Sequence, residues 1–244
     1  MFYIFEAMSF KSTIAYFKHQ LTANNRHGTH SPFVYRLADE VIYDFSAKKV
    51  YETIETQRKK LLHDDESVKL LAKKKLSQPR LGQLIFRLAL NSSPQTLLVL
   101  NANFGINAAY LAKACPQAKI IAVEPCSATA AIASKTFEEL DVTNVELHVG
   151  SFKEVVSKID NIDFVYIDGK QTQETVLAYF NCCLPQLHEQ SAFICYGINQ
   201  NEEMKQAWVE LKNHPQVRVT INLFWLGLVY FKKDQAKEHF KLKF

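Results

Sequence analysis

The chain has 244 residues, of which 48% are hydrophobic and 22% are charged, and its formal net charge is only +4. A length and composition of this kind suit a folded globular protein with one core, and they exclude a disordered, fibrous or strongly basic chain. No run of about 18 apolar residues is present, so we expect no membrane span.

The cysteines and the charged stretches bear on location and partners. The number of cysteines is odd and no metal-type spacing occurs, which indicates reduced thiols in a cytoplasmic protein. The first residues, MFYIFEAMSF, lack the basic segment of a signal peptide. The basic stretches 58–60 and 73–75 stand beside acids. We interpret them as solvated helix faces rather than a track for phosphates, and we expect neither a nucleic-acid nor a membrane partner.

Residues 1–76 predict a helical extension. Apolar residues recur at helical spacing from Phe10 to Leu21. After a polar break, Ser31 is a good N-cap and Pro32 suits the first position of a second helix. Two more helices are expected over 50–62 and 67–76. These aromatic-rich helices could cover a ligand-binding crevice of the remaining chain or pair two copies in a homodimer.

Over 77–244, apolar runs alternate with amphipathic stretches. This alternation is typical of β-α-β units and a mostly parallel sheet. Only Phe224 and Trp225 separate the last two runs, so these two strands must be antiparallel. We therefore predict an α/β fold: a Rossmann-like, doubly wound sheet of seven strands with a C-terminal antiparallel hairpin. The predicted strands are 96–100, 119–123, 145–149, 164–167, 191–196, 217–223 and 226–231, and the predicted helices are 81–90, 106–113, 126–140, 152–159, 172–184 and 201–213.

The ends of the first two predicted strands are candidates for ligand binding, because open α/β sheets bind ligands outside the carboxyl ends of their strands. In the first turn, Asn101, Asn103 and Gly105 could let the backbone approach a ligand, since glycine and, less readily, asparagine adopt left-handed angles. Glu124 follows the second strand, about 20 residues after Gly105, where an acid can bind both hydroxyls of an adenosine ribose. The alternative is an acid placed to begin the next helix.

The third and fourth predicted strands end in further candidates. Ser151 could meet the amino group of an adenine and Phe152 could cover its ring, although Ser151 also suits a helix N-cap. Asp168 faces the same crevice and could contact the cofactor, orient the substrate or be a remnant of a metal site. The alternative is a turn aspartate paired with Gly169.

Two histidines in the N-terminal region are candidates for a general base. His27 and His30 lie in a polar loop between predicted helices, and such a loop could fold over the crevice and supply a group that titrates near neutral pH. The alternative is a helix-capping and packing motif. Three tyrosines near these segments are interpreted as packing residues rather than acids: Tyr35, Tyr166 and Tyr196.

These motifs together resemble the O-methyltransferase-like branch of the class I S-adenosylmethionine-dependent methyltransferases, and especially uncharacterised bacterial members from relatives of Bacteroides. Methyltransferase sheets also carry a C-terminal antiparallel strand, whereas dehydrogenase-type folds stay parallel. The resemblance implies S-adenosylmethionine as cofactor and a small-molecule methyl acceptor. It covers most of the chain through the segments 27–35, 82–84, 100–112, 165–169, 204–208 and 239–244.

The sequence departs from that family at the expected cofactor and metal positions. The family usually has an acid near Val99 and a glycine where Asn101 stands. Metal-dependent members carry an Asp-Asn pair where Gly197 and Ile198 stand, and Mg²⁺ needs several oxygen ligands, so we expect no catalytic metal. A histidine common in relatives is replaced at 170–171, which removes their general base.

Three hypotheses remain open from the sequence. The first is an active methyltransferase for a small oxygen or nitrogen nucleophile, since methyl transfer needs mainly alignment and a metal is not essential. The second is a non-catalytic descendant that binds the cofactor, its demethylated product or a protein partner. The third is another nucleotide-binding Rossmann protein, although 101–106 lack the G-x-G-x-x-G motif of nicotinamide enzymes.

Overall fold

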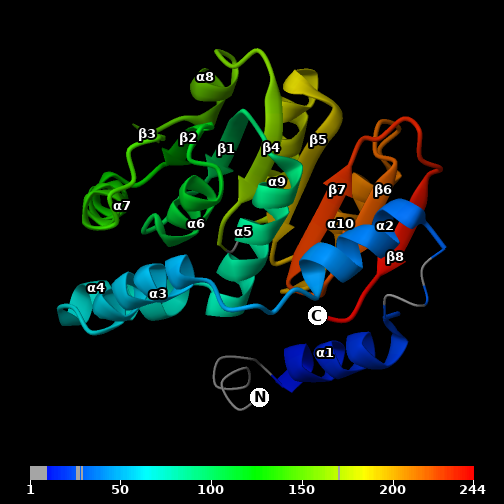
Figure 1. Cartoon of the computed structure of the whole chain (residues 1–244), viewed down its shortest axis with the longest axis horizontal. Helices are drawn as coiled ribbons and strands as arrows, with labels where there is room; N and C mark the ends of the chain where they lie inside the picture. Colours follow the sequence, from blue (N-terminus) through cyan, green and yellow to red (C-terminus); the bar gives the residue numbers. More distant parts are fainter. Residues whose placement is uncertain (1–9, 26–27, 29, 170) are drawn as a thin grey trace.

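A single twisted sheet organises the computed structural model, which describes residues 10–25, 28, 30–169 and 171–244 (Figure 1). In these residues the sheet has eight strands in the order β3-β2-β1-β4-β5-β7-β6-β8. The strands are β1 Thr96–Leu100, β2 Lys119–Glu124, β3 Val145–Val149, β4 Ile162–Ile167, β5 Leu187–Tyr196, β6 Val219–Asn222, β7 Leu226–Tyr230 and β8 Glu238–Lys241.

The direction of the strands confirms the predicted Rossmann-like architecture. β1 to β5 run parallel, and β7 joins β5 and β6 in antiparallel pairs. The strand count corrects the prediction of seven, because β8 adds to the outer edge of β6 as a parallel strand. The four residues of β8 have mixed polarity, and a pattern this short cannot be identified as a strand from sequence. They form a strand because β6 offers a free backbone edge with which they can pair.

Helices cover both faces of the sheet, as a doubly wound fold requires. The helices are α1 Phe10–Thr22, α2 Pro32–Leu37, α3 Lys49–Leu62, α4 Glu66–Lys75, α5 Pro79–Ser92, α6 Ile106–Ala114, α7 Ser127–Glu139, α8 Phe152–Val156, α9 Gln173–Cys183 and α10 Glu202–Asn213. On one face, α2, α3, α5, α6 and α7 pack against alternate strand residues such as Leu97 and Val99. On the other, α8, α9 and α10 pack against the intervening residues, such as Leu98 and Leu100.

Two of the places where the N-terminal extension packs against the sheet domain lie at α2, with the turn that follows it, and at α1. Ser31 caps α2 as predicted, with its Oγ accepting from the Val34 amide at 3.4 Å. The following turn, Ala38–Ile42, is a π-helix, and the buried Arg87 of α5 donates to the carbonyls of Val41 (2.8 Å) and Ile42 (3.4 Å) at its end. At the second place, α1 lies beside the end of the chain, where its His19 ring contacts the Leu242 carbonyl at 2.9 Å (Figure 1).

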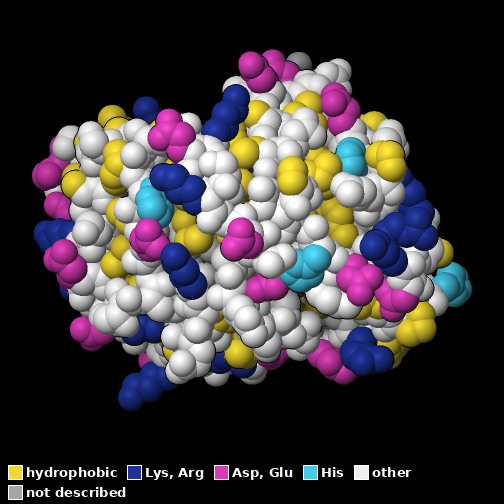
Figure 2. Space-filling view, turned by 90° about the horizontal axis from the view of Figure 1, so that it is seen from above, with side chains coloured by type: hydrophobic (Ala, Val, Ile, Leu, Met, Phe, Trp, Pro, Cys, Tyr) yellow, Lys and Arg dark blue, Asp and Glu magenta, His cyan; other side chains and the backbone are white. Residues whose placement is uncertain are grey.

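The boundary between 1–76 and 77–244 stays a prediction. Side chains of the extension, such as Ile42 and Ile54, belong to the same buried cluster as Leu97 of β1. None of the helices in the described part of the chain is both long and apolar enough to cross a membrane. On the face seen in Figure 2, basic and acidic side chains are interspersed, so this face carries no field of a single sign.

Candidate ligand-binding crevice

The carboxyl ends of β2, β1 and β4 bring the main candidates together. Leu100 at the end of β1 is in register with Val123 of β2 and with Ile167 of β4. The residues that follow these strands, Asn101 and Asp168 among them, are therefore neighbours. The strand order reverses between β1 and β4, and this switch point is where open α/β sheets bind their ligands.

The turn after β1 has the left-handed backbone that its composition predicts. Asn101 has φ +62°, Asn103 has φ +51° and Gly105 has φ +79°. A Cβ added at Gly105 would lie 2.8 Å from Cε1 of Phe137, so both the backbone angle and the packing of α7 require glycine there. The asparagines take the same region at a steric cost, which local hydrogen bonds of their amides offset.

Glu124 points into the protein rather than into the crevice. Its side chain is only 1% exposed. Its Oε2 accepts from the backbone N–H of Asn103 at 2.8 Å, and its Oε1 accepts from the backbone N–H of Cys126 at 3.2 Å. Both carboxylate oxygens therefore fix the turn after β1 and the start of α7. The predicted contact with ribose hydroxyls is not available in this arrangement.

Asp168 is a buried carboxyl group surrounded by donors. Its Oδ1 accepts from Asn107 Nδ2 at 2.9 Å, from the Gly169 amide at 2.8 Å and from the Tyr166 hydroxyl at 3.3 Å. Burial raises the pKa of Asp168 to about 7, although these hydrogen bonds favour its charged form. Burial and the charge of Asp168 raise the pKa of Tyr166, so its hydroxyl remains a donor.

Three asparagine side chains fill the space between the ends of β1 and β4. Asn101 donates through Nδ2 to the Asp168 carbonyl at 2.9 Å, and Asn103 donates through Nδ2 to the Asn101 carbonyl at 3.0 Å. Asn107, in the first turn of α6, joins Asp168 to Ser77, whose Oγ lies 3.1 Å from Asn107 Nδ2. We call Asn101, Asn103 and Asn107, with these hydrogen bonds, the asparagine network.

Sequence reasoning missed Asn107 and Ser77. Asn107 had a usable signal, because it lies in the first turn of the helix after the predicted glycine turn and its side chain can reach the neighbouring strand end. Ser77 had none, since only the packing of α5 against α6 brings the segment before α5 to this place.

Tyr196, at the end of β5, is half-buried, and burial together with the negative charge of Asp168 raises its pKa to about 12.

The remaining candidates lie at varying distances from this cluster. Ser151 is exposed and occupies the N-cap of α8 without a capping hydrogen bond from its side chain. Phe152 is half-buried and meets the ring of Tyr179 edge-on, with 4.6 Å between centroids. Both follow β3, the edge strand next to β2, so they border the crevice on the side of Glu124.

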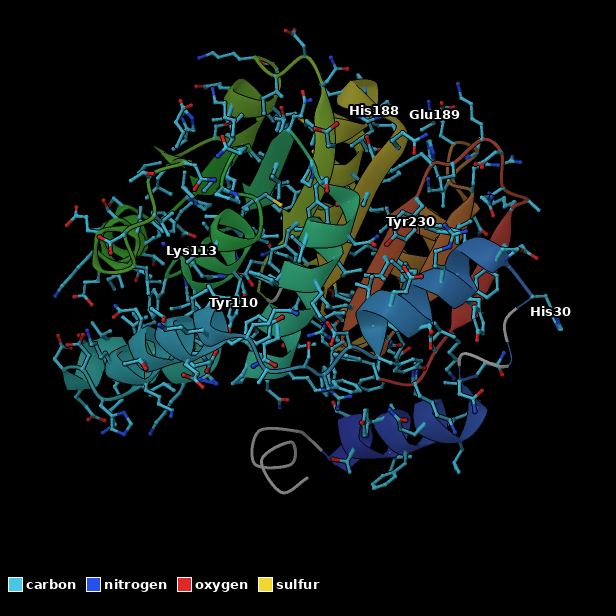
Figure 3. The ribbon with its side chains drawn as sticks, in the orientation of Figure 1. His30, Tyr110, Lys113, His188, Glu189 and Tyr230 are labelled. Carbon is cyan, nitrogen blue, oxygen red and sulfur yellow. The ribbon has the colours of Figure 1, made fainter. Side chains whose placement is uncertain are left out.

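His30 is not brought to the crevice. Its neighbour Ser31 lies 3.5 Å from Oε1 of Gln235, just before β8, and β8 is separated from β4 by three strands. Figure 3 shows His30 at one edge of the molecule, beyond α2. The expectation of a base from this loop is therefore not met by His30. His27 lies outside the described residues.

The end of β5 offers no side-chain oxygen at the two positions after Tyr196, which Gly197 and Ile198 occupy. In the described part of the chain, His, Cys, Asp and Glu side chains nowhere gather in threes that could hold a metal ion. Asp168 thus has only neutral amide and hydroxyl neighbours within hydrogen-bond distance.

Comparisons with known proteins agree with this architecture. A family model described as a methyltransferase domain matches residues 102–196. The fold is similar to a methyltransferase from Podospora anserina solved with S-adenosylhomocysteine (TM-score 0.62, 15% identity, 84% of this chain and 97% of that one). It is also similar to an O-methyltransferase from Bacillus cereus in complex with S-adenosylhomocysteine (0.59, 15%, 77% and 93%).

A third similar structure is the O-methyltransferase TomG from Streptomyces achromogenes, which is involved in tomaymycin synthesis and was solved with S-adenosylmethionine (TM-score 0.58, 15% identity, 81% of this chain and 94% of that one). No curated protein gives a significant sequence match. At these identities the likeness establishes the fold. The chain has the Rossmann-like fold of class I O-methyltransferases.

Proposed function

We propose that the protein is an S-adenosylmethionine-dependent methyltransferase that acts on a small-molecule oxygen or nitrogen nucleophile. The observation that carries this proposal is the buried carboxyl group of Asp168 beside the end of β1, at the switch point of a methyltransferase fold. The similar structures that contain S-adenosylmethionine or S-adenosylhomocysteine support the choice of cofactor.

The residue types suit the parts of this cofactor. A carboxylate after β2 matches the sugar hydroxyls, and the carboxylate of Asp168 matches the cationic amino group of the methionine moiety. Ser151 and Phe152 border the side on which the adenine would lie. S-adenosylmethionine supplies an electrophilic methyl group when bound, and the chain's part is to align the acceptor with it and exclude water.

In this structure the groups that would hold the cofactor are already engaged within the protein. Glu124 is 1% exposed, with both oxygens bonded to backbone amides, and the asparagine network fills the space beside Asp168. The residues therefore fit the cofactor in kind but not in their present arrangement. Binding requires the side chains over Asp168 to move.

We also propose that the reaction needs no metal ion. The absence of side-chain oxygens at Gly197 and Ile198 supports this, because Asp168 alone offers too few oxygen ligands for Mg²⁺. Alignment of two bound reactants can supply most of the acceleration that such a transfer needs.

Calorimetric titration with S-adenosylhomocysteine tests the proposed cofactor site. We expect the wild type to bind with a dissociation constant on the order of 100 µM or lower. Asp168→Asn keeps an oxygen for the three donors but removes the charge, so its binding should be weaker by about tenfold. Asp163→Asn, at the other end of β4, is the matched control and should bind like the wild type. A Glu124 variant is less suitable because it would unpair two backbone amides.

The outcomes separate the hypotheses. Absence of binding both to a wild-type protein that unfolds cooperatively and to a folded variant with shortened side chains over Asp168 would exclude the methyltransferase proposal. Binding followed by release of S-adenosylhomocysteine from S-adenosylmethionine in the presence of candidate acceptors would establish turnover. Binding without turnover across oxygen and nitrogen acceptors would instead identify a non-catalytic descendant.

A further inference from the structure

We propose that Asn101, Asn103 and Asn107 close the cofactor crevice, and that these side chains determine whether an adenosine-bearing ligand can enter. The proposal rests on the proposed function, since it concerns access to the same site. It goes beyond that function because it assigns to three asparagines a control over affinity that the fold does not imply.

The asparagine side chains help to bury Asp168 under the turn after β1. Asn103 is 3% exposed, Asn107 is 4% exposed and Asp168 beneath them is 3% exposed. A Cβ added at Gly169 would lie 2.8 Å from Asn103 Nδ2 and 3.1 Å from Asn101 Nδ2. The two amides therefore lie directly on the backbone of the turn after β4, where a ligand at the switch point would have to lie.

The hydrogen bonds of the asparagine network form one chain across the crevice. Glu124 holds the backbone of Asn103, and the Asn103 side chain holds the carbonyl of Asn101. The Asn101 side chain then holds the carbonyl of Asp168. From there the chain continues through the Asp168 carboxyl group and Asn107 to Ser77. The links to Glu124 and Asp168 join the turn after β1 to two other strand ends, and the link from Asn103 to Asn101 lies within that turn, so a ligand that displaces one side chain loosens its neighbours.

Opening of the crevice requires only changes of side-chain rotamer. The links from Asn101 to the Asp168 carbonyl and from Asn103 to the Asn101 carbonyl are part-buried amide hydrogen bonds, and each can be exchanged for water when a side chain rotates. Two of the three residues also hold left-handed angles that asparagine tolerates less well than glycine. The closed form is therefore a conformation that can open, and the apparent dissociation constant is the intrinsic one divided by the open fraction.

Glycine substitutions separate this role from a purely structural one. Asn101→Gly with Asn103→Gly removes the two side chains that lie on Gly169 and gives the turn a G-x-G-x-G spacing. Glycine accepts φ +62° and +51° without steric cost, and the backbone N–H of residue 103 can still donate to Glu124. The substitutions thus open the crevice while leaving the turn its conformation.

The matched control is Ser93→Gly. Ser93 also has a left-handed backbone, with φ +46°, but it caps α5 at the amino end of β1 and lies away from the crevice. Any effect of relieving a strained backbone angle should appear in Ser93→Gly as well. An effect of opening the crevice should appear only in the double variant.

The experiment is calorimetric titration of S-adenosylhomocysteine into the wild type, the double variant and Ser93→Gly, with thermal unfolding of each to verify the fold. We expect the double variant to bind about tenfold tighter or more. This is the gain in affinity that follows if the crevice is open in about 10% of the wild-type molecules or fewer. Ser93→Gly should match the wild type. If the double variant fails to unfold cooperatively, the single Asn101→Gly, which frees the Asp168 carbonyl, serves in its place.

Two results would overturn the proposal, and they differ in what they say about function. Equal or weaker binding by the glycine variant, with clear binding by the wild type, would show that the asparagines do not restrict entry, while the proposed cofactor site would stand. Absence of binding by every variant would overturn both, because an opened crevice would then have no affinity for the ligand.

Discussion

The two ends of β4 each carry an aspartate, and the two side chains have opposite environments. Asp163, near the amino end, accepts from the amides of Gln95 and Thr96 at 2.8 Å each and lies 2.9 Å from His188 Nε2. Burial acts to raise its pKa, but these three partners outweigh burial, and the pKa of Asp163 lies below its usual value. Asp168, past the carboxyl end, has its pKa raised to about 7 by burial.

This contrast separates a structural carboxylate from a candidate functional one. Asp163 is part exposed and bonded to backbone N–H groups, so its charge stabilises the start of β1 and β4. Asp168 is buried among neutral donors, and among the described residues its hydrogen-bond partners are amide and hydroxyl groups. A titratable group held away from its ordinary pKa at the switch point of an α/β sheet is typical of a functional site.

The two ends of the parallel strands also differ in how much open space surrounds them. A cavity of about 610 Å³ lies at the amino end of β5, beside His188 and Arg218, and Figure 3 shows His188 at that end of the molecule. At the carboxyl ends, the asparagine network covers Asp168 and leaves it 3% exposed. At the open end His188 and Arg218 already have hydrogen-bond partners, and the filled end holds the perturbed carboxyl group.

The pH dependence of stability is the largest expected difference between the two aspartates. The folded-state pKa of Asp168 is raised from 3.8 to about 7, so its contribution to stability is present below pH 4 and is lost as the pH rises towards 7. Asp168→Asn does not titrate. Its unfolding free energy relative to the wild type should therefore increase by on the order of 2–4 kcal/mol between pH 4 and pH 8.

Urea unfolding at several pH values measures this difference. A gap between Asp168→Asn and the wild type that stays constant from pH 4 to pH 8 would show that Asp168 titrates normally. In that case Asp163 and Asp168 would not differ in the direction of their pKa shifts.

A smaller effect is expected at Asp163. Asp163→Ala leaves the amides of Gln95 and Thr96 without their acceptor, and we expect a loss of about 1–2 kcal/mol at pH 7. Asp163→Asn keeps an acceptor oxygen and should lose less than half as much. Because the folded pKa of Asp163 is lowered, the loss in Asp163→Ala should shrink as the pH falls below 4. A loss independent of pH would contradict a role for its charge.

The sequence predicted the sheet well because the strands of its centre are continuous apolar runs. β1 and β3 have the predicted bounds, and the single two-residue connection at Phe224 and Trp225 was sufficient to predict the antiparallel end. The left-handed backbone at Asn101 and Asn103 also followed from residue type. Local pattern and turn chemistry determine these features, so they are visible without tertiary structure.

The orientation of side chains at the crevice could not be predicted in the same way. Position alone placed Glu124 at the end of β2, but whether its carboxylate faces a ligand or the amides of Asn103 and Cys126 depends on the path of two turns. His30 was associated with the crevice by residue type, whereas the packing of α2 places it near β8. Such choices between partners depend on contacts distant in sequence.

Amide chemical shifts of the ¹⁵N-labelled protein during titration with S-adenosylhomocysteine test the central claim most directly. If the carboxyl ends of β1, β2 and β4 form the cofactor site, the amide signals of Asn103 and Cys126, which donate to Glu124, should shift with added ligand. Those of Gln95 and Thr96, which donate to Asp163 at the opposite end, should stay in place. Unchanged signals at Asn103 and Cys126 under saturating ligand would contradict the account.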